Sequence, residues 1–98
     1  MNVYIKVHYK NDIEIIAICD ENLLCKVFQE GNLRIEISNH FFGGDLIQID
    51  KAIAILKQVS YFNIIGESIV QEAINNKILN KEGIRYINGV PMALKMMF

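Results

Sequence analysis

The stretch VYIKVHYKNDIEIIAI, residues 3–18, decides the fold because it reads as two strands joined by a turn. Apolar and polar residues alternate in its first half, which is the two-residue period of a half-buried strand. Asn11-Asp12 supplies turn chemistry, and apolar residues then occupy both sets of alternating positions over residues 13–18. The stretch therefore predicts a β-hairpin whose second strand is covered on both faces or lies centrally in a sheet.

Three segments further along the chain carry apolar residues at the spacing of a helix face. Asp20 is placed to cap the first of these helices, which Gly31 would end in the left-handed conformation. The second helix is expected over residues 50–59 with Asp50 as its cap, and the third over residues 66–76. Amphipathic helices cannot bury themselves, so these last two are expected to lie across one face of a sheet.

Two further strand predictions complete the fold. Alternating residues predict a strand over residues 33–37. Asn88-Gly89 lies between strand-like runs, which predicts a tight hairpin because both turn positions need positive φ. Pro91 has no amide hydrogen, so its strand is expected to be an edge strand or to bend there. The sequence therefore predicts one small α+β domain over residues 1–98, roughly β-β-α-β-α-α-β-β, with a mostly antiparallel sheet and two helices on one face.

The composition indicates a folded domain with almost no net charge. Hydrophobic residues make up 52% of the 98 residues and one proline interrupts them, which argues against a disordered linker. Ten basic residues against eleven acidic ones leave a formal charge of −1, so the chain lacks the positive field that drives nonspecific nucleic-acid binding. No DNA partner is expected. An RNA partner would need a local basic patch, for which the candidates are Lys6, Lys26, Arg34 and Arg85, although acidic residues alternate with them.

The two cysteines and the N-terminus bear on the cellular compartment. Cys19 and Cys25 are too few for a disulfide framework and lack the spacing of a zinc site, so they are expected to be reduced. The opening MNVYIKVHYK contains no apolar run long enough for a signal peptide or a spanning helix. The sequence therefore predicts a cytoplasmic protein with no membrane partner.

The segment HFFGGD, residues 40–45, is the first candidate binding segment. It matches neither the GxxxxGK[ST] phosphate loop nor the GxGxxG dinucleotide pattern. Gly43-Gly44 could bring backbone amides close to an anion, whereas Asp45 next to them opposes negative charge. The simpler interpretation is a turn from a strand into a helix, with Phe41-Phe42 anchoring the strand end. Both interpretations remain open on the sequence alone.

The segment NIIGE, residues 63–67, is the second candidate. Gly66 is expected to open a helix whose first amides could bind an anion. Glu67 already complements the helix dipole there, which favours a capping role over that of a catalytic base. Asn63 can donate and accept hydrogen bonds and is the best companion for a site. No spacing pairs a histidine with a cysteine or serine, so no catalytic residue, metal site or cofactor is predicted.

The chain resembles the archaeal family known as domain of unknown function 424. The resemblance covers nearly the whole chain and rests on YIKV, CDENLLCKVFQEGNLRIEIS, FFGGDL, NIIGE and NGVPMA, in that order. It implies an archaeal cytoplasmic protein with a compact α+β fold, and no settled activity. A histidine commonly follows the Gly-Val-Pro element in this family, whereas this chain has Met92, which counts against catalysis at that position. The motif positions are Phe42, Gly43, Gly44, Asn63, Gly66, Glu67, Gly89 and Pro91.

The leading functional hypothesis is a non-enzymatic binding module for an unknown protein or RNA partner, in an RNA- or translation-related role. The alternative is a small enzyme or ligand-binding protein with a site between the Gly43-Gly44 loop and the helix start from Asn63 to Glu67. That site would need Asp45, Asn63 and Glu67 to converge on one pocket. The apolar tail, residues 95–98, either completes the core or forms a homodimer interface through the C-terminal strand.

Overall fold

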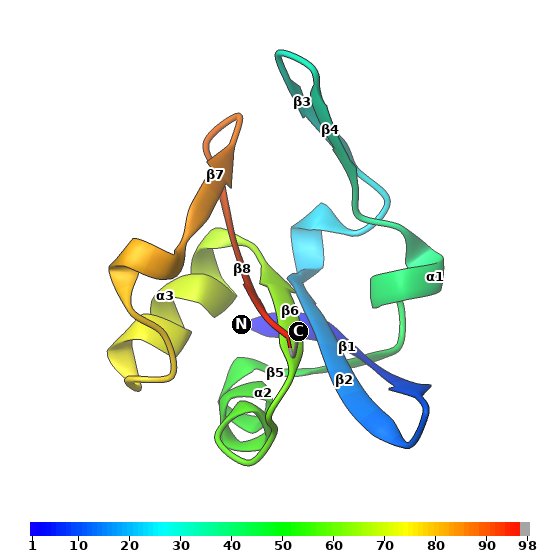
Figure 1. Cartoon of the computed structure of the whole chain (residues 1–98), viewed down its shortest axis with the longest axis vertical. Helices are drawn as coiled ribbons and strands as arrows, with labels where there is room; N and C mark the ends of the chain where they lie inside the picture. Colours follow the sequence, from blue (N-terminus) through cyan, green and yellow to red (C-terminus); the bar gives the residue numbers. More distant parts are fainter. Residues whose placement is uncertain (97–98) are drawn as a thin grey trace.

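Strands β1 (Asn2–Lys10) and β2 (Ile13–Asp20) form the predicted antiparallel hairpin, with Val3 opposite Asp20 at its open end. The structure is a computed structural model that describes residues 1–96 (Figure 1). Asn11 and Asp12 adopt φ values of 52° and 67°, so both turn residues occupy the left-handed region that short polar side chains tolerate. The prediction of a hairpin over this stretch is confirmed.

The hairpin is the nucleus of a mixed sheet. Strands β5 (Asp45–Gln48), β6 (Phe62–Ile65), β7 (Arg85–Ile87) and β8 (Val90–Lys95) extend it. Within residues 1–96 the sheet has six strands in the order β5-β1-β2-β6-β8-β7. Neighbouring strands are antiparallel except β2 and β6, which are parallel. The fold is therefore α+β with a mostly antiparallel sheet, as predicted.

Two helices, α2 (Ile49–Leu56) and α3 (Glu67–Asn75), cover one face of this sheet, as predicted. Their buried residues pack against the alternate residues of β1, β2 and β6 that point toward them. The buried residues of this main core are Val3, Ile5, Ile16, Ile18, Ala52, Ile53, Leu56, Phe62, Ile64, Ile69, Val70, Ala73 and Ala93. The Cα radius of gyration is 12.5 Å, close to the value of about 13 Å for one compact domain of 100 residues.

The other face of the sheet is covered by shorter elements. These are the 3₁₀ turn η1 (Glu21–Leu23), the hairpin of β3 (Val27–Glu30) and β4 (Leu33–Glu36), and the short helix α1 (Asn39–Phe42). The buried residues of this second core are Ala17, Cys19, Leu23, Ile37, Phe42 and Ile65. Because both sets of alternating residues in β2 are buried, the prediction that this strand is covered on both faces is confirmed.

The predicted helix from Asp20 to Gly31 is wrong. The chain makes one 3₁₀ turn and then becomes extended at Leu24, while Cys25 adopts a φ of 70°. Residues 27–30 form β3, and Gly31, with a φ of 60°, lies in the turn to β4 instead of ending a helix. Short helices have a costly nucleus, and here Leu23, Leu24 and Phe28 contribute to the second core from a 3₁₀ turn and a strand.

Two local predictions around residues 40–50 also need correction. HFFGGD does not lead from a strand into a helix, because its aromatic residues end α1 and the glycines lead into β5, a strand that the sequence did not predict. Ser38 caps α1 by accepting the Phe41 amide at 3.1 Å. Asp50 is not the cap of α2, since that helix begins one residue earlier and Gln48 occupies the cap position without a side-chain bond.

The Asn88-Gly89 turn joins β7 to β8 as predicted, with φ values of 49° and 82°. The expectation that Pro91 marks an edge strand is wrong, because β8 lies between β6 and β7. The register of β8 with β6 starts at Met92, and beyond it the Gly66 amide donates to the Pro91 carbonyl at 2.9 Å. The missing amide hydrogen of Pro91 therefore falls where β6 has already ended.

The C-terminal part of the chain holds one more turn and the end of the sheet. The 3₁₀ turn η2 (Lys81–Gly83) precedes β7, and β8 ends at Lys95. Of the predicted apolar tail, Met97 and Phe98 lie outside the described residues. Among the described residues, no helix combines the length and the apolar character needed to cross a membrane.

Candidate functional site

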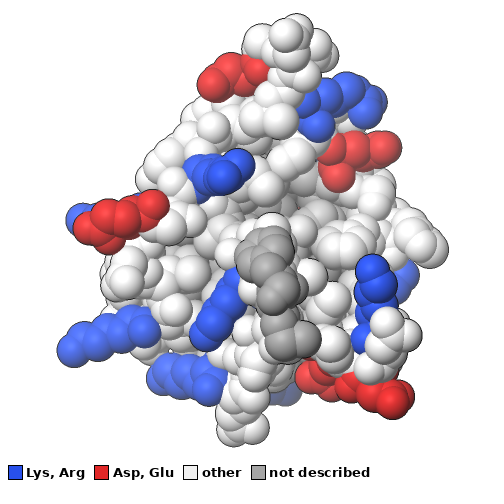
Figure 2. Space-filling view, in the orientation of Figure 1, with Lys and Arg blue, Asp and Glu red and all other residues white. Residues whose placement is uncertain are grey.

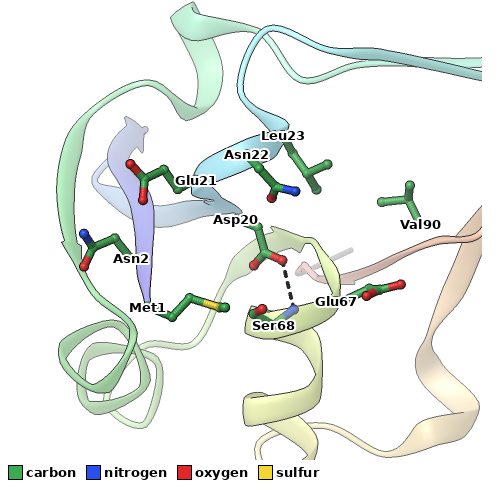
Figure 3. Close-up of a pocket in the computed structure, with 9 residues that line it drawn as sticks. All are labelled: Met1, Asn2, Asp20, Glu21, Asn22, Leu23, Glu67, Ser68 and Val90. Atoms are coloured by element: carbon green, nitrogen blue, oxygen red, sulfur yellow. Dashed lines mark hydrogen bonds between the residues drawn. The ribbon is translucent and has the colours of Figure 1, made fainter.

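The buried carboxyl of Asp20 joins the end of β2 to the start of α3. Asp20 is 7% exposed, and its Oδ2 accepts the Ser68 amide at 2.9 Å (Figure 3). Its Oδ1 accepts the Ile69 amide at 3.0 Å. The parallel pairing of β2 with β6 makes this possible, because both strands end at the same edge of the sheet and α3 starts directly after β6. Asp20 therefore caps a helix that begins far along the chain.

Gly66 makes the close approach between Asp20 and α3 possible. It occupies the cap position of α3 with a φ of 128°, a conformation that side chains rarely adopt. A Cβ at this position would overlap the carboxyl group of Asp20. The glycine predicted to open a helix therefore does so, and its missing side chain leaves room for the carboxylate.

Burial shifts the pKa values of two adjacent groups, the Asp20 carboxyl and the Cys19 thiol. Burial raises the pKa of the Asp20 carboxyl, the amide hydrogen bonds from Ser68 and Ile69 oppose this, and the nearby charge of Glu67 adds to it. Burial and the neighbouring Asp20 raise the pKa of the Cys19 thiol to about 12. Cys19 is therefore an inert core thiol at neutral pH, since the thiolate is the reactive form.

A cavity of about 400 Å³ opens beside this cap. Its lining residues come from the start of β1, the end of β2, η1, the first turn of α3 and the start of β8 (Figure 3). They are Met1, Asn2, Asp20, Glu21, Asn22, Leu23, Glu67, Ser68 and Val90. Three carboxyl groups line the cavity, and Asp20 already uses the Ser68 and Ile69 amides. The expected anion site at the start of this helix is therefore taken by the protein's own carboxylate.

The Gly43-Gly44 loop has a packing role beside β1, at the edge of the sheet formed by β5. Gly44 lies so close to β1 that a Cβ would overlap the carbonyl of Ile5, and a Cβ on Gly43 would overlap Asn39. Phe42 is a buried residue of the second core. The loop thus brings the chain from α1 into β5 along the side of β1.

The structure does not bring Asp45 and Asn63 together. Asp45 pairs with Ile5, whose side chain faces α2 and α3, whereas Asn63 pairs with Ala17, which belongs to the second core. Their side chains therefore point to opposite faces of the sheet. Since β1 and β2 lie between β5 and β6, the two strands are three spacings, or about 14 Å, apart. The site predicted between these two segments is not assembled.

The remaining candidates lie in different surroundings. Asn63 carries a buried Oδ1 atom without a hydrogen-bond partner. Glu67 is exposed on the first turn of α3, where it lines the cavity beside Asp20. Pro91 is buried and lines a separate hollow that also includes Glu67. Of the predicted site residues, Glu67 and Pro91 therefore line the same hollow.

The basic residues do not form one continuous patch. Lys6 donates to the carbonyl of His40 on the second face of the sheet, whereas Arg34 lies on the hairpin of β3 and β4. At the end of the molecule where this hairpin projects, acidic and basic side chains lie next to each other (Figure 2). Within the described part of the chain, no group of three histidine, cysteine, aspartate or glutamate residues could hold a metal ion.

Sequence reasoning missed the real role of Asp20 and the cavity beside it. The residue carries a recognisable signal, since a carboxylate directly follows the continuous apolar run of residues 15–19. That signal indicates a polar group at the end of a buried strand. It does not indicate which helix start the carboxylate reaches, because that depends on the parallel pairing of two strands more than 40 residues apart.

Comparisons with known proteins agree with this architecture. A family model described as "Protein of unknown function (DUF424)" matches residues 7–97. A crystal structure described as that of an uncharacterized conserved protein from Methanopyrus kandleri is similar, with a TM-score of 0.82 and 23% sequence identity. The match covers 96% of this chain and 90% of that chain, and at this identity it shows the fold alone. No curated protein matches the chain.

Proposed function

The chain belongs to the DUF424 family of proteins of unknown function, and we propose that it is a non-enzymatic binding module for a protein or RNA partner. The groups that could have served chemistry have structural roles instead. Asp20 caps a helix, and Cys19 is a core thiol with a pKa of about 12. The Gly43-Gly44 loop leads into β5 and Asn63 lies on β6, and β1 and β2 separate these two strands. These roles support binding over catalysis.

The observation that carries the proposal is a pair of hairpins tied together at one end of the molecule. The hairpin of β3 and β4 and the hairpin of β7 and β8 project from the same end (Figure 1). Glu30 at the tip of the first accepts the backbone amide of Asn88 in the turn of the second at 2.7 Å. The tie adds to the contacts between β3 and β7 and holds the two hairpins in one arrangement, which lowers the entropy lost when a partner binds.

These hairpins display apolar side chains that a solvated surface does not require. Val27 is 46% exposed, Leu33 57% and Tyr86 63%. Arg34 and Arg85 lie on the same two hairpins. Aromatic and arginine residues are enriched at protein interfaces, and the same side chains stack on bases in RNA complexes. The composition of this end of the molecule therefore supports recognition of a macromolecular partner.

A pull-down with the tagged full chain tests the proposal. The bait is incubated with a lysate of the source organism at low and at moderate salt, with and without ribonuclease. We expect one protein or ribonucleoprotein to be enriched by the wild-type chain and lost with the Val27→Ser/Leu33→Ser variant. Loss of the enriched material after ribonuclease treatment would identify an RNA partner. Binding of an RNA partner should also weaken more strongly between low and moderate salt, because phosphate contacts are sensitive to salt.

A matched variant controls for general loss of strand stability. Val7→Ser/Leu46→Ser removes two apolar side chains of similar exposure, 42% and 45%, from strands away from the hairpins. This variant should enrich the same partner as the wild-type chain. The proposal is overturned if the wild-type chain enriches nothing, or if both double variants lose the partner equally.

We also propose, from the sequence alone, that the protein is cytoplasmic.

A homodimer through the C-terminal strand is a separate proposal. β8 carries Leu94, which is 56% exposed. The pairing of β8 with β7 covers only Val90 to Met92. Among the described residues, no strand therefore pairs with this side of β8 at Leu94. Light scattering of the wild-type chain and of Leu94→Glu would show a concentration-dependent dimer that the variant cannot form. A wild-type monomer at high concentration would remove this proposal.

A further inference from the structure

Three adjoining hollows share the lining residue Glu67 and lie around the first turns of α3. The cavity of about 400 Å³ beside Asp20 shares Glu67 and Ser68 with a hollow of about 360 Å³ that continues to Gln71. On the other side, Glu67 and Gln71 also line a hollow of about 370 Å³ that reaches Pro91 on β8. We name this surface the α3 groove. It runs from η1, along α3, to the hairpin of β7 and β8.

The α3 groove has one sign of side-chain charge. The ionisable side chains that line it are those of Asp20, Glu21, Glu67, Glu72 and Tyr86. Among the described residues, no lysine, arginine or histidine side chain lines any of the three hollows, and the α-amino group of Met1, a residue that lines two of them, is outnumbered by the four carboxyl groups. The amides of Ser68 and Ile69 cannot compensate this charge for a ligand, because Asp20 already accepts both. The groove therefore favours cationic groups and opposes phosphate.

The same groove offers apolar contacts. Leu23 and Val90 line it near η1, and Ile74 lines it beside Pro91. Tyr86, which is 63% exposed, stands at the end formed by β7. A free metal ion would use none of these apolar contacts, and an RNA backbone would place phosphates against the carboxylates. The chemistry matches a polypeptide segment that carries both basic and apolar side chains.

We propose that the α3 groove docks a basic, apolar segment of a protein partner. The inference rests on the proposed binding function and narrows it to a protein. Charge complementarity with the acidic side chains carries it, together with continuity between the groove and the tied hairpins: Tyr86 belongs to both surfaces. Lysine or arginine side chains of the segment pair with Glu21 and Glu67, and its apolar side chains contact Tyr86 and Val90.

Selection from a random peptide library on the immobilised full chain tests the inference. We expect the selected peptides to combine lysine or arginine with leucine, isoleucine, valine or aromatic residues. One selected peptide is then synthesised, and its affinity is measured by fluorescence polarisation. The Glu21→Gln/Glu67→Gln variant should bind it about tenfold more weakly, because two favourable charge contacts are lost. Added salt should weaken binding to the wild-type chain.

The control variant changes the net charge equally outside the groove. Asp12→Asn/Glu82→Gln neutralises one acid in a turn and one in η2, both exposed and neither lining the groove. It should bind the selected peptide as tightly as the wild-type chain. The inference is overturned if the library yields no binder, if the binders lack basic residues, or if both double variants bind equally.

A uridine oligonucleotide and the pull-down separate this inference from the proposed function. Binding of the oligonucleotide that weakens in Glu21→Gln/Glu67→Gln would place RNA in the groove and overturn the inference. The same variant serves as bait in the pull-down. If it keeps a partner that Val27→Ser/Leu33→Ser loses, the groove is not the docking surface although the binding function stands. If the wild-type bait enriches nothing, the proposed function itself fails.

Discussion

Asp20 accepts the backbone amide of Ser68 at 2.9 Å although 48 positions separate the two residues. The bond connects the last residue of β2 to the first turn of α3, so the capping of this helix depends on the tertiary fold. It also fixes one wall of the cavity in which Glu21 and Glu67 are exposed. Fold stability and the candidate binding surface therefore share one residue.

Removal of the Asp20 side chain should destabilise the protein. In Asp20→Ala the amides of Ser68 and Ile69 lose their acceptor in a buried position, so we expect the free energy of unfolding to fall by about 2 kcal/mol. Urea unfolding followed by circular dichroism measures this change. Glu21→Ala, at the exposed neighbouring position, should change the free energy by less than about 0.5 kcal/mol. Equal effects of the two substitutions would contradict the capping role.

Gly66→Ala should be more destabilising than an alanine at an open glycine. The new Cβ would overlap the Asp20 carboxyl, and the φ of 128° is unfavourable for alanine, so we expect a loss of about 3 kcal/mol. Gly83→Ala is the control, because a Cβ there meets no atom within 4 Å. Urea midpoints of the two variants should differ clearly, and similar midpoints would show that the approach of Gly66 to Asp20 is not tight.

The stability of the protein should depend on pH through Asp20. Burial raises the pKa of this carboxyl above its ordinary value of 3.8, so the folded state holds the proton more strongly than the unfolded chain. The resulting stabilisation is complete below about pH 3.8 and is lost as the pH rises through the higher pKa of the folded state. The asparagine in Asp20→Asn does not titrate.

The measurable quantity is the free energy of unfolding of the wild-type protein minus that of Asp20→Asn. This difference should decrease as the pH rises from about 4 toward 7, and chemical denaturation at several pH values measures it. The same subtraction with Asp12→Asn controls for the removal of one negative charge from the chain. A difference for Asp20→Asn that increases with pH would mean that the two amide hydrogen bonds outweigh burial.

Local patterns predicted most elements whose residues contact their sequence neighbours, with the hairpin of β3 and β4 as an exception, since β3 was predicted to be part of a helix. The alternation in residues 3–9 and the Asn88-Gly89 turn specify hairpins through adjacent strands, and both hairpins were predicted correctly. The apolar stripe of α3 likewise predicted a helix and the face that it buries. In each case, the physical cause of the structure lies within about twenty residues of the chain.

Apart from the hairpin of β3 and β4, the failures involve residues whose partners lie far along the chain. Asp20 has the right chemistry for a cap, and only the parallel pairing of β2 with β6 shows that it caps α3 instead of the next segment. β5 contains four residues and gives too short an alternation to identify. The separation of Asp45 from Asn63 likewise follows from the strand order, which neither segment encodes locally.

The two cysteines should differ strongly in reactivity. Cys25 is exposed, whereas Cys19 is fully buried and has a pKa of about 12. Ellman's reagent should therefore modify one thiol in the native protein and two after unfolding in guanidinium. Cys25→Ser should show no rapid reaction until the protein unfolds. A rapid native reaction of this variant would contradict the burial of Cys19.

Loss of the tie between the hairpins should increase local opening at the turn of β7 and β8. Glu30→Ala removes the acceptor of the Asn88 amide, so hydrogen exchange of that amide should accelerate between about twofold and tenfold, as expected for the loss of one hydrogen bond. Glu30→Gln is the matched control because its amide oxygen still accepts a hydrogen bond. Nuclear magnetic resonance resolves the exchange of this single amide. If both variants exchange as slowly as the wild-type protein, the hairpins are held by their packing alone, and the rigid presentation of Val27, Leu33 and Tyr86 does not depend on Glu30.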